Sequence, residues 1–366
     1  WIAANGNTDT AATMARDVFA HFEGARAHEA LEEADRDAYE TFEAGLESLQ
    51  TGIDDGDAGG IDDAVATIDE TLRTGIKRLA GGDAPLLQSG FFRARFADAY
   101  ERYRQGEAAT AATIAEGLFG RFEANELNFH ETLEDTSESL YETFEEEHLT
   151  ALVTAYEDDN SSAVDTHHQG VCNALLEFEA EHSAALASGA EAGYMGARGF
   201  DAAGVAALGD ASRASTIVSD AFAHFESGAA GYHEAIEAAD VERYESFEAA
   251  LGAIQTAVDD GGDVYAKAKA FNDEAVASAY AIAESGGATA PAAAMMGDAF
   301  AHFEQAEVHE ALEEADHDTY EGFEAALESY QSGLESGDTE PVARYAAMAR
   351  TGGFAGAGAA AAAPAH

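Results

Sequence analysis

The chain of 366 residues carries 71 acidic and 18 basic residues, a formal net charge of -53 at pH 7. Because such an excess of one sign repels itself unless salt screens it, the composition favours a protein of a salt-saturated environment and makes nucleic acid and anionic membranes poor partners. Hydrophobic residues make up 46% of the chain, enough to fill a core, which argues against an acidic disordered chain.

The ends of the chain and its single cysteine bound its setting. The sequence begins at Trp1 without a methionine, so we expect that a signal peptide was removed before this residue. Cys172 is the only cysteine, which excludes an internal disulfide framework. No apolar run approaches the roughly 20 residues of a membrane-spanning helix. Residues 355–366, nearly all alanine, are predicted to form a tail or linker.

One sequence unit recurs four times along the chain. Each copy contains a Phe-Glu pair, a His-Glu pair and a Tyr-Glu-x-Phe-Glu string, and the interval from the histidine to the tyrosine is 11 residues in every copy. These intervals run from His28 to Tyr39, His130 to Tyr141, His233 to Tyr244 and His309 to Tyr320. Chance does not hold one spacing four times, so we infer internal repeats.

The apolar pattern within the repeats is helical. In the first copy one stripe at helical spacing comprises Tyr39, Phe42, Leu46, Leu49 and Ile53. After a turn signal, a further helix is predicted with an apolar stripe of Ile61, Val65, Ile68, Leu72, Ile76 and Leu79. Strand alternation is missing. We therefore predict an all-α fold of tandem up-down helical bundles stacked in series, with repeats at 1–107, 108–211, 212–289 and 290–354.

The polar residues of the unit admit two interpretations. Glu29 is expected on the helix face of Phe22, where a carboxylate needs a partner or a metal. Repeats 2 and 3, however, insert two residues before the His-Glu pair, which turns Glu131 and Glu234 by about 200° unless a bulge absorbs the change. We therefore favour a structural role for the pair over metal binding, and we expect Glu43 on a solvated or salt-bridged flank. The motif residues considered are His21, Glu23, His28, Glu29, Tyr39, Glu43, His224, His233, His302 and His309.

The second repeat departs from the others at core positions. Aligned on the motif tyrosines, Leu46 becomes His148, and the next helix replaces two aliphatic residues by His168 and His182. Histidines at core positions of one bundle alone suggest a site. If the two helices pair as a hairpin, His148 and His168 are roughly 6 Å apart along the axis, whereas His168 and His182 are about 21 Å apart.

The predicted ligand set is therefore His148, His168 and Cys172, with Glu145 nearby and with His182 and Glu179 as a second tier. Imidazole and thiolate suit copper or zinc. Two Glu-x-x-His strings also invite comparison with di-iron carboxylate bundles, so iron is the third candidate metal. Buried, hydrogen-bonded histidines without a metal are the alternative that we favour over either site.

Motifs for catalysis are otherwise lacking. The sequence has no phosphate loop, no GxSxG, no HExxH and no CxxCH, so neither a nucleotide nor covalent haem is expected, and we do not expect an enzyme. The glycine-rich stretch from Gly193 to Gly199 follows a predicted helix and no strand, which favours a hinge between repeats over a dinucleotide loop.

The repeated pattern HFExxxxHExLExAD followed by YExFE, together with the acidity, resembles a family of haloarchaeal envelope proteins in which such repeats precede a small blue-copper domain. The resemblance covers the chain from about Asp9 to Asp338. It implies a cell-surface location and a blue-copper redox partner, although the ligands of a copper domain are not in this chain. The FE and YExFE strings alone are distantly similar to the helical extracytoplasmic parts of iron-permease systems.

Three functions follow as hypotheses. The leading one is a secreted or surface-anchored scaffold that self-assembles as a homo-oligomer or filament, or contacts other envelope proteins, or holds a neighbouring domain away from the envelope. Its motivation is the fourfold repeat without a catalytic motif. The alternative is a metal-binding envelope module centred on repeat 2, and the third is an enzyme with a di-iron centre.

Overall fold

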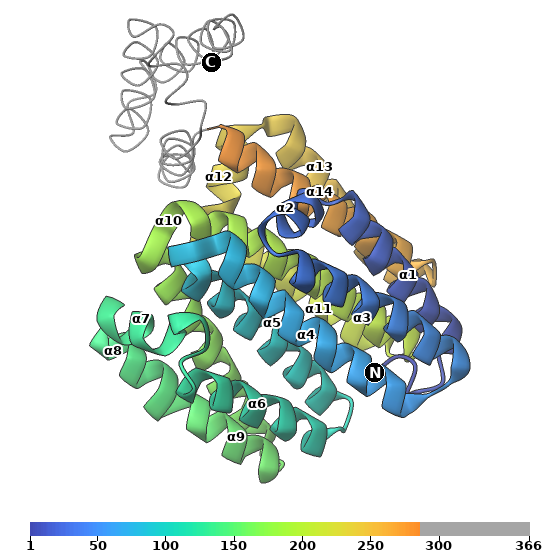
Figure 1. Cartoon of the computed structure of the whole chain (residues 1–366), viewed down its shortest axis with the longest axis horizontal. Helices are drawn as coiled ribbons and strands as arrows, with labels where there is room; N and C mark the ends of the chain where they lie inside the picture. The colour runs from blue at the N-terminus through green and yellow to red at the C-terminus, as the bar shows by residue number, and fades with distance from the viewer. Residues whose placement is uncertain (286–366) are drawn as a thin grey trace, which may run out of the picture. The chain divides into compact units, whose positions relative to one another are not determined.

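The structure, a computed structural model, describes residues 1–285 (Figure 1). This range contains helices and no strand, which confirms the all-α prediction. Residues 1–237 and 241–278 form one compact unit, so the described repeats do not separate into bodies of their own, and residues 238–240 and 279–285 fall into a second unit. The predicted fourth repeat and the tail lie outside the described residues.

The helices follow the repeat. The first copy comprises α1 (Thr8–Gly24), α2 (Arg26–Ala34), α3 (Arg36–Asp55) and α4 (Ala58–Ala80), and η1 (Gly81–Asp83) leads to α5 (Ala84–Arg104). The second comprises α6 (Ala108–Glu123), η2 (Glu126–Asn128), α7 (Phe129–Thr136), α8 (Glu138–Tyr141), the π-helix η3 (Glu142–Leu149), α9 (Thr150–Glu157) and α10 (Ser161–Ala207). The third comprises α11 (Ala211–Glu226), η4 (Ala229–Gly231), α12 (Tyr232–Ala239), α13 (Val241–Asp260) and α14 (Val264–Glu284).

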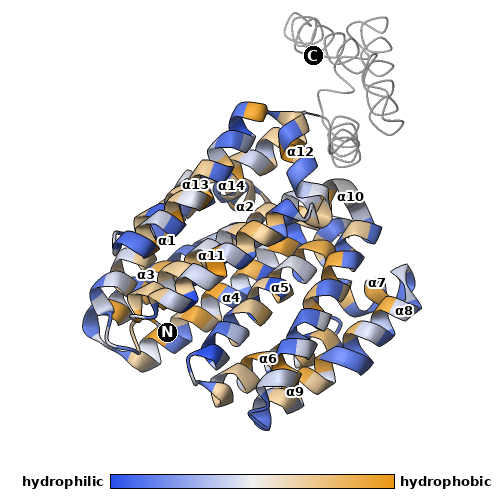
Figure 2. Cartoon of the chain, turned by 180° about the vertical axis from the view of Figure 1, so that it is seen from behind, coloured by the Kyte–Doolittle hydropathy of each residue, from blue (hydrophilic) through white to orange (hydrophobic). Residues whose placement is uncertain are grey.

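The main core forms where α5 and α10 pack against each other and against the helices of the second repeat. Its aromatic centre consists of Phe92, Phe96, Phe122, Phe129, Phe144 and Phe178, all 0–1% exposed. Each such side chain contributes about 1.5–3 kcal/mol by leaving water. Figure 2 shows apolar residues along the inner helices α5 and α11. None of the helices within residues 1–285 combines the length and the apolar character that a membrane span needs.

Buried ion pairs tie α5 to α10 and α11. The guanidinium of Arg93 lies 2.8 Å from both Glu179 and Glu191, and all three side chains are at most 2% exposed. On the same helix, Glu101 accepts hydrogen bonds from Arg198 at 2.8 Å and from Arg213 at 2.7 Å. Buried charges need such partners, because an unpaired ion in a low-dielectric interior is strongly unfavourable.

Two glycines of α3 bring α4 unusually close. A Cβ atom on Gly45 would lie 3.0 Å from the side chain of Ile68, and one on Gly52 would lie 3.1 Å from the backbone nitrogen of Ile61. The face of α4 that is buried therefore carries small residues, namely Ala64, Thr71 and Gly75. The predicted apolar stripe of this helix is wrong as a fully buried face, because Val65, Leu72 and Leu79 are 50%, 40% and 44% exposed.

The π-helix η3 absorbs one extra residue in the second repeat. The interval from the motif tyrosine to the left-handed residue after the long helix is 18 residues here, to Asp159, and 17 residues from Tyr39 to Gly56. Because η3 shifts the register by one, Leu149 is fully buried and His148 is only half-buried. The alignment of His148 with the core residue Leu46 was therefore wrong.

The long helix α10 bends at Ser183, whose φ of -160° and ψ of 97° are not helical. The Oγ atom of Ser183 accepts a hydrogen bond of 3.4 Å from the backbone N–H of Leu186, as an N-cap does. The segment before this bend belongs to the second repeat. The segment after it, which includes Gly193 to Gly199, is helical, so the predicted glycine-rich hinge lies within a helix.

Candidate metal centre

Each described repeat brings a glutamate, a histidine, a tyrosine and a second glutamate together at the end of its first helix. We call these groups the first, second and third clusters. The first comprises Glu23, His28, Tyr39 and Glu43; the second, Glu123, His130, Tyr141 and Glu145; the third, Glu226, His233, Tyr244 and Glu248. The corresponding residues of the fourth copy, including His302 and His309, lie outside the described residues.

The first cluster joins the ends of α1, α2 and α3. The Nε2 atom of His28 lies 3.3 Å from Oε1 of Glu23 and 3.1 Å from the hydroxyl of Tyr39. The histidine ring packs edge-on against Phe22, with ring centroids 5.2 Å apart. A hydrogen bond to Glu43, followed by burial, raises the pKa of Tyr39 to about 12, so this phenol stays protonated at neutral pH.

The second cluster has the same layout and is more deeply set. The Nε2 atom of His130 lies 3.9 Å from Oε2 of Glu145, and its ring lies 4.7 Å from that of Phe122. The Oε2 atom of Glu145 is buried and makes no hydrogen bond. Burial raises the pKa of Glu145, and a hydrogen bond from its neighbour Glu123 raises it further, against opposing contributions from Tyr141 and His130. The two carboxyl groups therefore hold a proton between them more readily than separate ones would.

The third cluster repeats the contact between histidine and tyrosine. The Nε2 atom of His233 lies 3.2 Å from the hydroxyl of Tyr244, and the ring of Phe225 lies 5.0 Å from that of His233. Burial raises the pKa of Tyr244, and the charge of Glu248 raises it further.

Left-handed turns explain how the histidine keeps its place despite the insertion of two residues in repeats 2 and 3. Repeat 1 passes from α1 to α2 through Ala25 alone, with φ -82° and ψ 145°. Repeats 2 and 3 insert η2 and η4, in which the residues with positive φ are Asn125, Leu127 and Asn128, and Gly228, Ala230 and Gly231. The rotation of about 200° expected for a continuous helix therefore does not occur. The premise on which a structural role was preferred for the His-Glu pair was wrong.

The donor atoms of the first two clusters can converge on one ion. In each, one ligand atom from each of the two glutamates and the histidine lies within 4.8 Å of the others. Within residues 1–285 these are the groups of three or more histidine, cysteine or carboxylate ligands that do so. Two carboxylate oxygens and one imidazole nitrogen form a mixed set that suits zinc or iron, and such a set lacks the thiolate that selects copper(I).

The ligand set expected from the second repeat is divided in the structure. His148 lies with its Nδ1 atom 3.1 Å from Nδ1 of His167, whereas Nε2 of His168 lies 3.7 Å from Sγ of Cys172. Glu145 belongs to the second cluster instead. Burial raises the pKa of Cys172 to about 11, and burial with the charge of Arg198 lowers the pKa of His168 to about 4. Both groups are therefore neutral near pH 7.

The remaining predicted residues lie apart from one another. Glu179 pairs with Arg93 and accepts a hydrogen bond of 2.8 Å from Ser89, while the ring of His182 stacks on Phe178. His224 lies 2.6 Å from Glu191, and the exposed His21 lies 3.9 Å from Asp273. Glu29 is exposed, because α1 ends before it and a new helix begins at Arg26.

The sequence did contain a signal for the clusters. The glutamates of the Phe-Glu pair and of the Tyr-Glu-x-Phe-Glu string flank the histidine in all four copies, and a polar residue repeated beside an apolar stripe marks a shared contact. The analysis by helical phase followed Glu29 and assumed an unbroken helix. The break at Ala25 placed His28 in the cluster in its stead.

These residues define an all-helical repeat protein with one Glu-His-Tyr-Glu cluster in each described copy. The chain belongs to the family described as a domain of unknown function, DUF5059, whose model matches residues 1–364. Neither the comparison with curated proteins nor the comparison with solved structures finds a match.

Proposed function

We propose that this protein is a helical repeat protein that binds a divalent transition-metal ion, zinc or ferrous iron, in the Glu-His-Glu clusters of its repeats. The observation that carries the proposal is the convergence of the same three ligand types in two copies, although η2 changes the connection between them. Residues that served only as helix caps would not need to keep their mutual positions across that change.

Two features of the second cluster support a ligand role for Glu145. Its Oε2 atom is buried without a hydrogen-bond partner, which is unfavourable unless a cation or proton satisfies it. The residue also lies in a π-helix, a distortion that persists most often at functional sites. Both features place an incompletely satisfied acceptor beside an imidazole.

Titration calorimetry of the chelator-treated full chain with zinc chloride in molar salt tests the proposal. We expect at least two saturable sites, and we expect His28→Ala and His130→Ala each to remove one equivalent of zinc. Cobalt(II) gives an independent readout, because its visible bands report coordination by nitrogen and oxygen donors.

Glu43→Gln and Glu29→Gln form a matched pair for the same titration. Both remove one negative charge from the same repeat, but Glu29 is exposed and lies outside the first cluster. We expect only Glu43→Gln to abolish the first site. Equal losses in both variants, or no saturable binding in the unaltered chain, would refute the proposal.

A scaffold role is a second candidate, and the ion pairs between α5, α10 and α11 favour it because they hold the repeats as one body. In this role the protein would act at the cell surface as an oligomer. Light scattering in molar salt tests it, and a monomer at every concentration would remove self-assembly.

A further inference from the structure

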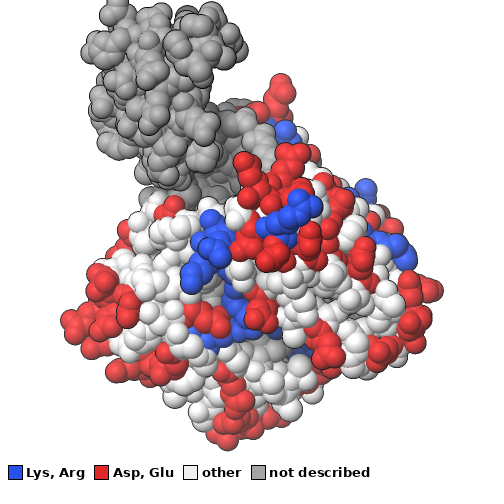
Figure 3. All heavy atoms as spheres, in the orientation of Figure 1, with Lys and Arg blue, Asp and Glu red and all other residues white. Residues whose placement is uncertain are grey.

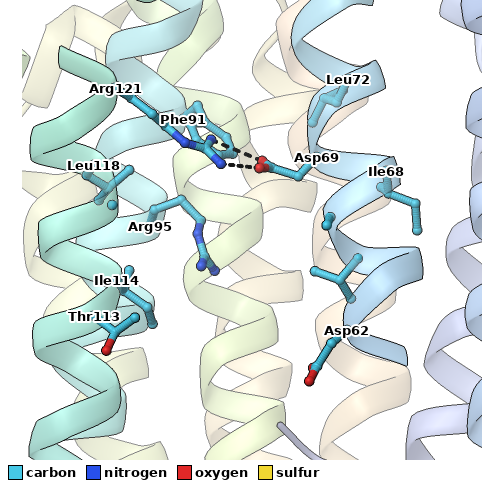
Figure 4. A pocket seen from close by; sticks show the side chains of 13 residues that line it. Asp62, Ile68, Asp69, Leu72, Phe91, Arg95, Thr113, Ile114, Leu118 and Arg121 are labelled. Carbon is cyan, nitrogen blue, oxygen red and sulfur yellow. Dashed lines mark hydrogen bonds and ion pairs between the residues drawn. The ribbon is translucent and has the colours of Figure 1, made fainter. Parts of the chain in front are cut away.

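A groove opens between α4, α5 and α6, away from the three clusters. Its volume is about 510 Å³, within the range of pockets that hold small ligands. Figure 3 shows acidic residues spread over this face of the molecule, with Lys and Arg residues gathered in and around a hollow. In Figure 4, α4 and α6 form the two walls and α5 lies between them.

The walls of the groove are apolar and incompletely covered. Val65 and Leu72 of α4 line one wall and are 50% and 40% exposed, and Ile114 and Leu118 line the other. The close packing of α4 on the glycines of α3 turns these larger side chains toward the groove. An apolar surface of this kind in a chain with a net charge of -53 marks a binding site better than a random exposed residue does.

Two arginines supply positive charge in the groove. Arg121 of α6 binds Asp69 of α4 across one end, and Arg95 of α5 projects between the walls (Figure 4). Burial disfavours the ionised form of Asp69, but hydrogen bonds from Arg121 and Arg73 outweigh it and hold the pKa of this carboxyl below its usual value. Each aspartate that pairs with a groove arginine has a second cation. Asp69 also binds Arg73 at 2.6 Å, and Asp98, the partner of Arg95, also binds Arg102 at 3.3 Å.

A ligand anion can therefore recruit Arg95 or Arg121 without leaving an aspartate unpaired. The pair of Arg95 and Asp98 is only partly buried, and such pairs hold weakly. Guanidinium groups recognise carboxylates through two parallel hydrogen bonds. The apolar walls would meanwhile shield a hydrocarbon chain from water.

We propose that this groove binds a small single-chain amphiphile with a carboxylate head, which pairs with Arg95 or Arg121 while its hydrocarbon tail lies along α4 and α6. This inference is independent of the metal clusters. A second copy of the chain is a poorer occupant, because two surfaces of strong negative charge repel each other.

Gly117 offers a direct test. It lines the groove, yet a Cβ atom added to it meets no atom within 4 Å, so Gly117→Leu fills the groove without a clash. Gly120, on the same helix, also has nothing within 4 Å of an added Cβ and does not line the groove, so Gly120→Leu is the matched control. Both changes replace a helical glycine by a better helix former.

The probes are decanoate and decan-1-ol, titrated into the full chain by calorimetry. We expect saturable binding of decanoate, an affinity for the alcohol lower by roughly tenfold, and a similar loss for decanoate in Arg95→Gln. Gly117→Leu should abolish binding and Gly120→Leu should retain it.

Three outcomes would overturn the inference. These are the absence of saturable decanoate binding, equal affinity for decanoate and the alcohol, and unchanged binding in Gly117→Leu. Dimerisation of the chain that is lost only in Gly117→Leu, without decanoate binding, would assign the groove to a second copy and would also overturn it.

Discussion

The hydroxyl of Tyr39 lies 3.1 Å from Nε2 of His28, the same nitrogen that approaches Glu23 at 3.3 Å. The equivalent tyrosine in the third repeat makes the same contact at 3.2 Å. In the metal-free protein the phenol therefore occupies the atom that the proposed ion would use. Tyrosine and metal compete for one nitrogen.

Tyr39→Phe should consequently strengthen zinc binding at the first cluster. Removal of a hydrogen bond that exists only in the metal-free state favours the metal-bound state by roughly threefold to tenfold. Zinc titration of the variant in a His130→Ala background isolates the first cluster. A weaker affinity would instead identify Tyr39 as a ligand.

Zinc binding at the second cluster should weaken as the pH falls, more steeply than at the first. Burial and Glu123 raise the pKa of Glu145, so the folded chain retains a proton that the ion must displace. Affinity then rises with pH through that raised pKa and levels off above it. Calorimetry of the His28→Ala variant in two buffers of different ionisation enthalpy measures the proton released, and binding without proton release would contradict the assignment.

Arg93→Met should destabilise the fold by about 3–5 kcal/mol, because it leaves the carboxylates of two buried glutamates without their cation. Urea unfolding at constant salt measures the loss. Arg36→Met is the control, since Arg36 pairs with glutamates only on the surface and little change is expected. Equal effects of the two substitutions would show that the buried network does not stabilise the fold.

His168 should add an acid-sensitive contribution to stability. Burial, followed by the charge of Arg198, lowers its pKa from the ordinary 6.5 to about 4 in the folded chain. The unfolded chain then binds a proton that the folded chain refuses, so stability is lost as the pH falls from about 6.5 to about 4. In His168→Gln this loss should be smaller, as urea unfolding at pH 7 and pH 5 would show. An identical pH dependence in both proteins would contradict the shift.

Stability should rise with salt. Screening of the net charge of -53 reduces repulsion within the compact state, so the melting temperature should increase steeply between about 0.1 M and 1 M salt. Sucrose at matched osmolality is the control for general solute exclusion. Equal increases in sucrose and salt would argue against charge screening.

Helical periodicity was sufficient to predict the fold class, but it could not identify the partner of each face. The stripe of Val65 and Leu72 was visible in the sequence, yet whether another helix covers it depends on the glycines of α3, which draw α4 inward along its small residues. Periodicity gives a direction around one helix, and burial needs a second helix.

The site was predictable only in part, for a similar reason. The histidine-to-tyrosine interval identified His28 and Tyr39, but Glu23 joins them through a break between helices that no constant phase describes. The extra residue that η3 accommodates misaligned His148 in the same way. Local departures from regular geometry decided both positions.

The left-handed turns η2 and η4 show that the step from the Phe-Glu pair to the histidine tolerates a change in length, whereas the step from histidine to tyrosine does not. Further copies of this unit in other chains should accordingly be sought with the first gap free and the second one fixed. A search that demands one rigid template would discard members whose chemistry is intact.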